Sequence, residues 1–182
     1  MTPFKLEQSP VLYFADFVLY PAAIIIGAGV LLWQGAGPVW ALLLAAALGF
    51  LSWSLIEYGL HRFVLHGLQP FKRWHEEHHQ RPFALIGTST LVSLSMLGLL
   101  VLWPLSAILG RWIGLSATLG VGAGYLLYVL VHHATHHWKA APGSWMHARK
   151  RDHALHHRPG AHGWYGVTTS FWDRVFLTDR NR

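Results

Sequence analysis

Four long apolar stretches constrain the fold of this chain more than any other feature. Each is long enough to cross the hydrocarbon core of a bilayer, which is about 30 Å thick. They run over residues 11–33, 38–60, 83–109 and 113–131. Only 12% of all residues are charged, against about a quarter in a typical soluble domain. The sequence therefore predicts an all-α integral membrane protein with four transmembrane helices, forming a single domain over residues 1–182.

The short links between the stretches and the basic residues predict a topology. Residues 34–37 and 110–112 leave room only for tight connections, so we expect two helical hairpins. All Lys and Arg residues except Arg111 fall on the side opposite these links, which the positive-inside rule makes cytoplasmic, with both termini. We attribute the net charge of +6 to this membrane face and not to nucleic-acid binding. In the fourth stretch, Gly120 and Gly124 predict close packing against another helix.

The chemistry-bearing residues are 14 histidines, all of which follow residue 60. The chain has no cysteine, so thiolate metal sites, disulfides and Cys-ligated iron–sulfur clusters are excluded. Imidazole is the commonest metal ligand and suits iron, zinc, copper and nickel. Four clusters follow membrane stretches or lie in the segment after the last one. One pair alone would indicate a solvated surface, but four clusters predict an all-histidine site for more than one metal ion.

Two of the clusters share one spacing. His75-x-x-His78-His79 and His153-x-x-His156-His157 place histidines at positions i, i+3 and i+4, which converge on one face of a helix. Each triplet can therefore offer two or three imidazoles to one centre.

The other two clusters leave alternatives open. His61 and His66 are five residues apart, which on a straight α-helix splays them by about 140°. Either they serve two different metal ions or the helix ends between them. In the remaining cluster, His132 shares a face with His136, and the next residues form the same pair one step on (133 and 137). The spacing does not choose which of these pairs points inward.

Taken together, the clusters resemble the integral-membrane di-iron fatty acid hydroxylase and sterol desaturase superfamily over residues 51–178. The resemblance is carried by Glu57-Tyr-Gly-Leu-His61-Arg-Phe-Val-Leu-His66, Trp74-His75-Glu-Glu-His78-His79, His132-His-Ala-Thr-His136-His137 and Arg151-Asp-His153-Ala-Leu-His156-His157. The closing run Gly166-Val-Thr-Thr-Ser-Phe-Trp172-Asp173-Arg-Val-Phe176 is similar to the end of fatty acid 2-hydroxylases. Phe176-Leu177-Thr178 departs from the aromatic-Gly-Thr ending of that group.

The resemblance implies two iron ions, or zinc as purified, at the cytosolic membrane boundary. The implied ligands are His61, His66, His75, His78, His79, His132, His136, His153, His156 and His157. Contacts to the ligands, without direct contact to metal, are expected for Glu57, His133, His137 and Asp152. His133 stands where the 2-hydroxylases are expected to have an aromatic residue. His147 and His162 have no counterpart and are expected on the surface or outside the site.

Glu57 has two interpretations. It lies one turn before His61 and is placed to accept the second imidazole proton of that residue, or it is an interfacial carboxylate exposed to lipid headgroups. Glu76 and Glu77 are expected to point off the ligand face of their helix. Asp16, within the first stretch, is assigned no role.

The implied activity is O2-dependent hydroxylation of a lipid C–H bond, with a fatty acyl chain favoured by the closing run. The same centre supports sterol or carotenoid oxidation, or desaturation, as alternatives. Only ten residues precede the first membrane stretch, so we expect electrons from a separate ferredoxin-type or haem-type protein. A different class is a membrane zinc-binding protein or zinc hydrolase. A zinc hydrolase needs three ligands, an open water position and a carboxylate base, and the ten matched histidines are more than one zinc ion requires.

Overall fold

The computed structural model describes residues 6–180, and its regular structure over that range is helical. Pairing of extended chain is limited, among these residues, to one isolated bridge between Glu7 and Ile86. Lys5 and Arg182, which contributed to the charge argument, lie outside the described residues. The predicted all-α class is confirmed.

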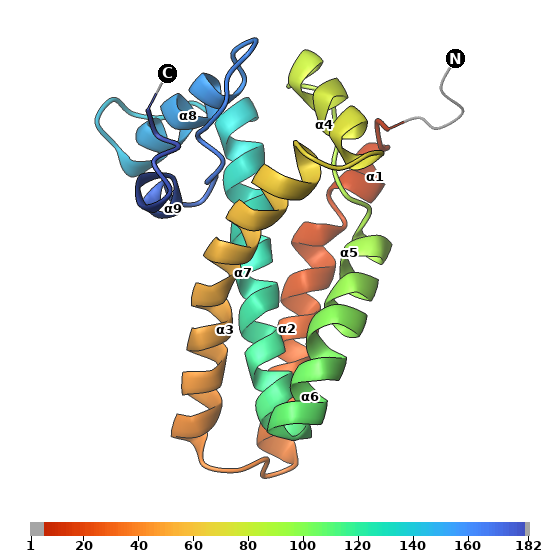
Figure 1. The fold of residues 1–182 in the computed structure, drawn as a ribbon. Helices are drawn as coiled ribbons and strands as arrows, with labels where there is room; N and C mark the ends of the chain where they lie inside the picture. The colour runs from red at the N-terminus through yellow and green to blue at the C-terminus, as the bar shows by residue number, and fades with distance from the viewer. Residues whose placement is uncertain (1–5, 181–182) are drawn as a thin grey trace. The chain divides into compact units, whose positions relative to one another are not determined.

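Figure 1 shows the helices in chain order. They are α1 (Pro10–Tyr13), α2 (Asp16–Trp33), α3 (Val39–Gly59), the π-helical turn η1 (Leu60–Leu65), α4 (Phe71–Gln80), α5 (Thr90–Leu97), the π-helical turn η2 (Gly98–Leu102), α6 (Trp103–Leu109), α7 (Arg111–His137), α8 (Trp145–His156) and α9 (Phe171–Val175).

Four helical segments are long and apolar enough to cross a membrane, which confirms the predicted number of spans. They are Pro10–Trp33, Val39–Leu65, Thr90–Leu109 and Arg111–His137. The third begins at Thr90 and not at residue 83, because residues 82–84 form a turn and a bend, and the chain then pairs with the N-terminal segment, where Gln8 N donates to the Leu85 carbonyl at 2.9 Å. The fourth continues beyond residue 131, since no Gly or Pro interrupts the chain before residue 142. Its last two turns therefore carry histidines.

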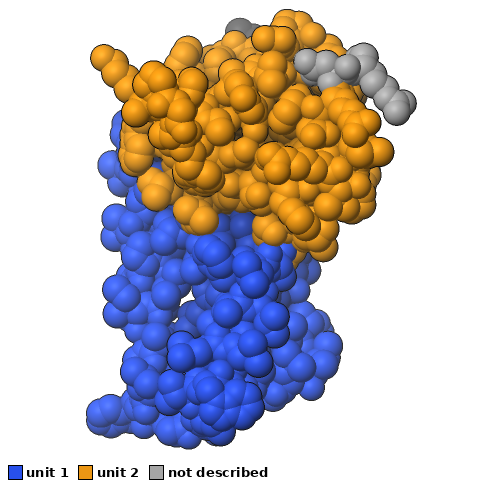
Figure 2. Space-filling view, turned by 90° about the vertical axis from the view of Figure 1, so that its left-hand side faces the viewer, with its two compact units in different colours: residues 1–53, 85–126 blue, residues 54–84, 127–182 orange. Residues whose placement is uncertain are grey.

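The described chain divides into two compact units, which Figure 2 shows in different colours. The first combines residues up to 53 with 85–126, and the second combines 54–84 with 127–182. Helices α3 and α7 contribute residues to both units.

In the first unit, α7 is the central helix. Of the 18 most apolar consecutive residues of α7, 44% are buried, against 17% or less in the other three spans. The predicted small-residue packing is present: a Cβ added to Gly120 would lie 1.9 Å from the Ala46 carbonyl oxygen of α3. Ser116 also donates to the Leu42 carbonyl of α3 at 2.7 Å. The backbones of α3 and α7 therefore pass each other without room for a methyl group.

Asp16 has a polar partner inside this apolar unit. The Tyr125 hydroxyl of α7 donates to Asp16 Oδ2 of α2 at 2.9 Å, and both residues are buried. Tyr20 packs on the Tyr125 ring at a centroid distance of 4.6 Å. A polar contact therefore accounts for the one acidic residue in the first span.

The second unit contains the end of α3, the turn η1, helix α4, the end of α7 and helices α8 and α9. In η1 the backbone hydrogen bonding widens from i→i+4 to i→i+5, and His66 N donates to the His61 carbonyl at 3.2 Å. Helix α8 begins at an N-cap, Ser144, whose hydroxyl accepts from His147 N at 3.1 Å.

Candidate metal centre

Ten histidines of the second unit come together in two groups of five. The first histidine group contains His61, His66, His75, His79 and His156, and the second histidine group contains His78, His132, His136, His153 and His157. Within each group one ring nitrogen of every residue lies within 4.8 Å of all the others. These are the ten residues implied as ligands by the motif resemblance.

Each histidine triplet is divided between the two groups. In α4, His75 and His79 belong to the first histidine group while His78 belongs to the second. In the triplet at the end of α8, whose C-cap is His157, the division is reversed, because His156 joins the first group while His153 and His157 join the second. Positions i+3 and i+4 lie about 100° apart around a helix. The histidine at i+3 therefore points to one group, and the pair at i and i+4 points to the other.

The π-helical turn brings His61 and His66 together. An i→i+5 turn places residue i+5 above residue i, so the splay of a straight α-helix does not arise. Their ring centroids lie 5.2 Å apart, and both residues enter the first histidine group. The spacing left two alternatives open, namely that these residues serve different metal ions or that the helix ends between them. The structure has neither, because both rings enter one group and the helix continues through η1.

At the end of α7, the inward pair is His132 and His136. His133 and His137 form the other face of the helix, where their rings stack at 4.4 Å. His133 is buried, and it lies outside both histidine groups.

The nitrogens within each group approach one another closely. The Nε2 atoms of His61 and His75 are 3.0 Å apart, and those of His136 and His153 are 2.8 Å apart. The Nδ1 atom of His61 donates to the Tyr165 carbonyl at 2.6 Å, and that of His156 donates to the Gly163 carbonyl at 2.8 Å. Since a carbonyl only accepts, these rings carry their proton on Nδ1 and direct an Nε2 lone pair into the group. That is the donor arrangement a metal ion requires.

The two histidine groups adjoin. His79 of the first group stacks on His157 of the second at a centroid distance of 4.1 Å. Neither group includes a carboxylate among the described residues. The set is therefore all imidazole and can hold metal ions in neighbouring positions.

Burial keeps the imidazoles neutral. Removal from water lowers the pKa of His66, His78 and His79 to about 4, and that of His157 to about 2. The same cause holds the pKa values of the half-buried His75 and of the buried His153 and His156 well below the ordinary value near 6.5. A neutral imidazole is the form that binds metal. At neutral pH these side chains are therefore ready to act as ligands.

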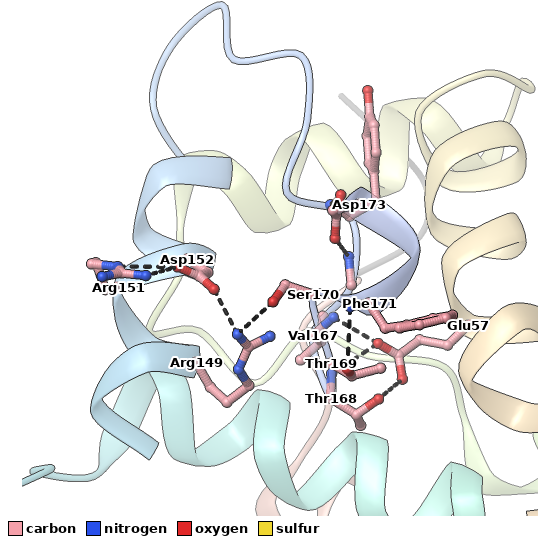
Figure 3. Close-up of polar contacts among 12 residues, drawn as sticks. Glu57, Arg149, Arg151, Asp152, Val167, Thr168, Thr169, Ser170, Phe171 and Asp173 are labelled. Atoms are coloured by element: carbon pink, nitrogen blue, oxygen red, sulfur yellow. Dashed lines mark hydrogen bonds and ion pairs between the residues drawn. The ribbon is translucent and has the colours of Figure 1, made fainter. Parts of the chain in front are cut away.

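The carboxylates near the ligands have other partners. Glu57 is only 3% exposed, so it is not an interfacial residue facing headgroups. Its carboxylate accepts from Val167 N at 2.6 Å, while the proton of His61 Nδ1 goes to a backbone carbonyl. Asp152 is buried in an ion pair with Arg149 at 2.6 Å (Figure 3). Glu76 is exposed, as expected for a residue off the ligand face.

The remaining histidines are peripheral. His147 Nδ1 accepts from Gly143 N at 3.2 Å and so contributes to the start of α8. His162 is exposed. Neither belongs to a histidine group, in agreement with the expected position outside the site.

Sequence reasoning missed the tail segment that supports the first histidine group. The carbonyls of Gly163 and Tyr165 accept the imidazole protons, and the buried Asp173 binds the same segment. A backbone carbonyl has no signature in a sequence. In the sequence, Asp173 is one residue of the closing run, and nothing there indicates its role. The structure shows that its side chain is completely buried.

The fold and this arrangement define an all-α multi-pass membrane protein with two adjoining histidine groups able to bind metal. The sequence model described as fatty acid hydroxylase matches residues 46–178. The chain belongs to the fatty acid hydroxylase family, which confirms the resemblance seen in the motifs.

Similar proteins agree with this assignment. The chain is 33% identical over 147 residues to dihydroceramide fatty acyl 2-hydroxylase FAH2 of Arabidopsis thaliana, covering 74% of this chain and 60% of that protein. It is 32% identical over 143 residues to fatty acid 2-hydroxylase of Homo sapiens, covering 72% of this chain and 38% of that protein. The chain thus spans less than two thirds of the length of these relatives. A solved structure of full-length Scs7p, with only its hydroxylase domain visible, matches with a TM-score of 0.82 and 25% identity, over 97% of this chain and 69% of that one.

Proposed function

We propose that this protein hydroxylates a C–H bond of a fatty acyl chain with O2, using two iron ions held by the two histidine groups. The observation that carries the proposal is the convergence of ten imidazoles, without a carboxylate, in two adjoining groups. The proposed ligands are His61, His66, His75, His79 and His156 for one ion and His78, His132, His136, His153 and His157 for the other. Membership of the fatty acid hydroxylase family supports a lipid substrate.

The residues of the chain prepare the site. When bound, two iron ions supply the redox chemistry that activates O2 and oxidises a C–H bond. The carbonyls of Tyr165 and Gly163 hold the protons of His61 and His156 on Nδ1, so that each Nε2 faces inward. Burial keeps the other imidazoles neutral, so no ligand must lose a proton before binding.

The reaction requires electrons from outside. Hydroxylation balances as R–H + O2 + 2 e⁻ + 2 H⁺ → R–OH + H2O. We propose that a separate electron-donor protein, of the ferredoxin or haem type, supplies the two electrons. The absence of cysteine excludes a Cys-ligated iron–sulfur cluster within this sequence.

We further propose that residues 1–182 act as one hydroxylase domain in which the spans form two hairpins. The histidine face and both termini are cytoplasmic in this proposal, where cellular reductant is available. The distribution of Lys and Arg, with Arg111 alone on the other side, supports this orientation. The lipid substrate reaches the site from the bilayer.

Isotope labelling tests the activity. Purified protein with iron, a fatty acyl lipid and a donor protein should place label from 18-O dioxygen in the product hydroxyl. Without the donor, product formation should stop at a single turnover. Label arriving from water, or sustained turnover without O2, would indicate the hydrolytic chemistry of a zinc enzyme. Comparing host lipids with and without the protein distinguishes acyl hydroxylation from sterol or carotenoid oxidation and from desaturation.

Reporter fusions test the orientation. A reporter inserted at Gly37, between α2 and α3, and one fused after the last residue should report opposite sides of the membrane. The C-terminal reporter should be cytoplasmic. A C-terminal reporter on the outer side would contradict the proposed orientation, because the face rich in Lys and Arg would then lie outside the cytoplasm.

A further inference from the structure

The tail segment 163–168 lies against the first histidine group and connects it to two buried carboxylates of the second unit. Its carbonyls face imidazoles: Tyr165 O accepts from His61 Nδ1 at 2.6 Å and Gly163 O accepts from His156 Nδ1 at 2.8 Å. The segment therefore determines which way two of the five rings in this group point.

Four consecutive amides of the same segment are bound by carboxylates. The amides of Tyr165 and Gly166 donate to Asp173 Oδ1 and Oδ2, each at 2.8 Å. The amides of Val167 and Thr168 donate to Glu57 Oε1 at 2.6 and 2.9 Å (Figure 3). Hydrogen bonds from amides to carboxylates are stronger than those between neutral groups. The segment is thus held along its length by charge-assisted bonds.

One peptide group connects Asp173 directly to His61. The amide of Gly166 and the carbonyl of Tyr165 belong to the same peptide unit, so its N–H binds the carboxylate while its C=O binds the ring. A peptide whose N–H is bound by a negative charge is polarised, and its carbonyl becomes a better acceptor. Asp173 has no exposed surface, so water does not weaken this connection.

The backbone of the segment agrees with such a constraint. Trp164 has a φ of 57°, a left-handed backbone conformation that residues other than glycine rarely adopt. It persists where surrounding contacts determine the conformation. At Gly166 an added Cβ would lie 2.0 Å from the Thr169 carbonyl oxygen and 2.8 Å from Asp173 Oδ2, so the close approach of this carboxylate depends on a residue without a side chain.

The second histidine group is not supported in this way. Among the described residues, His78 Nδ1 and His153 Nδ1 are buried without a hydrogen-bond partner. Contacts to segment 163–168 therefore distinguish the two groups.

We propose that Asp173 and Glu57 are positioning residues for the first histidine group, acting through the amides of segment 163–168 to hold two backbone carbonyls against His61 and His156. This inference rests on the proposed metal-binding function of the histidine groups. It adds that the two groups respond differently to changes in the tail segment, because only the first is oriented by it.

The two carboxylates differ in what they tolerate. Both oxygens of Asp173 face backbone N–H groups, so in Asp173→Asn an amide NH2 must face a donor. At Glu57 one oxygen accepts both amides and the other accepts from the Thr168 hydroxyl at 2.6 Å. A hydroxyl can also accept, so Glu57→Gln keeps these hydrogen bonds without their charge, while Glu57→Ala removes them.

Release of Zn²⁺ from proteins with one intact group tests the inference. Replacing His132, His136 and His153 by Ala leaves two imidazoles in the second histidine group and gives the first-group protein, while replacing His66, His75 and His79 by Ala gives the second-group protein. Loaded with Zn²⁺ and mixed with a chelator, the first-group protein should release metal about 10–100-fold faster when Asp173→Asn or Glu57→Ala is added. Neither change should alter release from the second-group protein, and Glu57→Gln should release metal more slowly than Glu57→Ala in the first-group protein.

Glu76→Ala is the matched control, because it removes the same charge from an exposed position beside His75 in the sequence. It should leave release from the first-group protein unchanged. Circular dichroism checks that each variant is folded. If Asp173→Asn does not fold, the comparison of Glu57→Ala with Glu57→Gln tests the positioning role by itself. Equal acceleration in both backgrounds, or none in either, would overturn the positioning role. A wild-type protein that binds no Zn²⁺ would instead overturn the metal assignment itself.

Discussion

Replacing His156 by Ala is expected to lower the proposed hydroxylation activity by more than about 100-fold, because loss of a proposed metal ligand costs more than the roughly 10–100-fold typical of changes to residues behind the ligands. His156 is 1% exposed, and its Nε2 lies 3.0 Å from that of His66 in the first histidine group. The variant should also hold less metal. Product analysis and elemental analysis of the purified protein measure the two effects separately.

His147→Ala is the control for this result. His147 lies in the same helix, α8, but outside both histidine groups, and its Nδ1 accepts from Gly143 N. Its removal should leave metal content and activity near those of the wild type. Equal and mild effects at both positions would favour a solvated histidine-rich surface over a metal centre.

Gly120→Ala is expected to prevent stable folding, with a loss of about 3 kcal/mol or more, because overpacking at this site displaces backbone and not a flexible side chain. The added Cβ would lie 1.9 Å from the Ala46 carbonyl oxygen, so α3 and α7 would have to separate. Thermal unfolding in detergent measures the effect.

Gly29→Ala in α2 is the matched comparison. A Cβ at Gly29 meets nothing within 4 Å. In a helix interior the change from Gly to Ala stabilises by about 0.5–1 kcal/mol when there is space for it. The two variants should therefore shift the unfolding temperature in opposite directions. A similar small shift at both positions would show that α3 and α7 do not pack through Gly120.

The number of membrane spans could be predicted from the sequence because apolar length alone determines it. The start of the third span could not, because the chain before Thr90 forms a turn and then pairs with residue 8, a contact distant in sequence. The end of the fourth was predicted too early, because hydropathy falls at His132 although nothing there interrupts the helix.

The spacing of the histidines predicts a metal site, but it does not predict which histidines belong to which group. The i, i+3, i+4 pattern of His75, His78 and His79 is compatible with one centre or with two. Only the packing of α4 and α8 within the second unit decides that each triplet divides between groups. The partners of His61 and His156 were hidden for a different reason, since every residue carries the carbonyl that they use.

The π-helical turn at Leu60–Leu65 makes this stretch sensitive to its length more than to its composition. Elsewhere, paired histidines of one group stand four residues apart, as at His75 and His79. Between His61 and His66 the chain takes five steps to reach the equivalent place, so it holds one residue more than an ordinary helix needs. A substitution at the outward-facing Phe63 leaves that count unchanged. Deleting any one of residues 62–65, which lie between the two histidines, would return the spacing to four steps and rotate everything that follows by about 100°, turning His66 away from the group while every histidine was still present in the sequence.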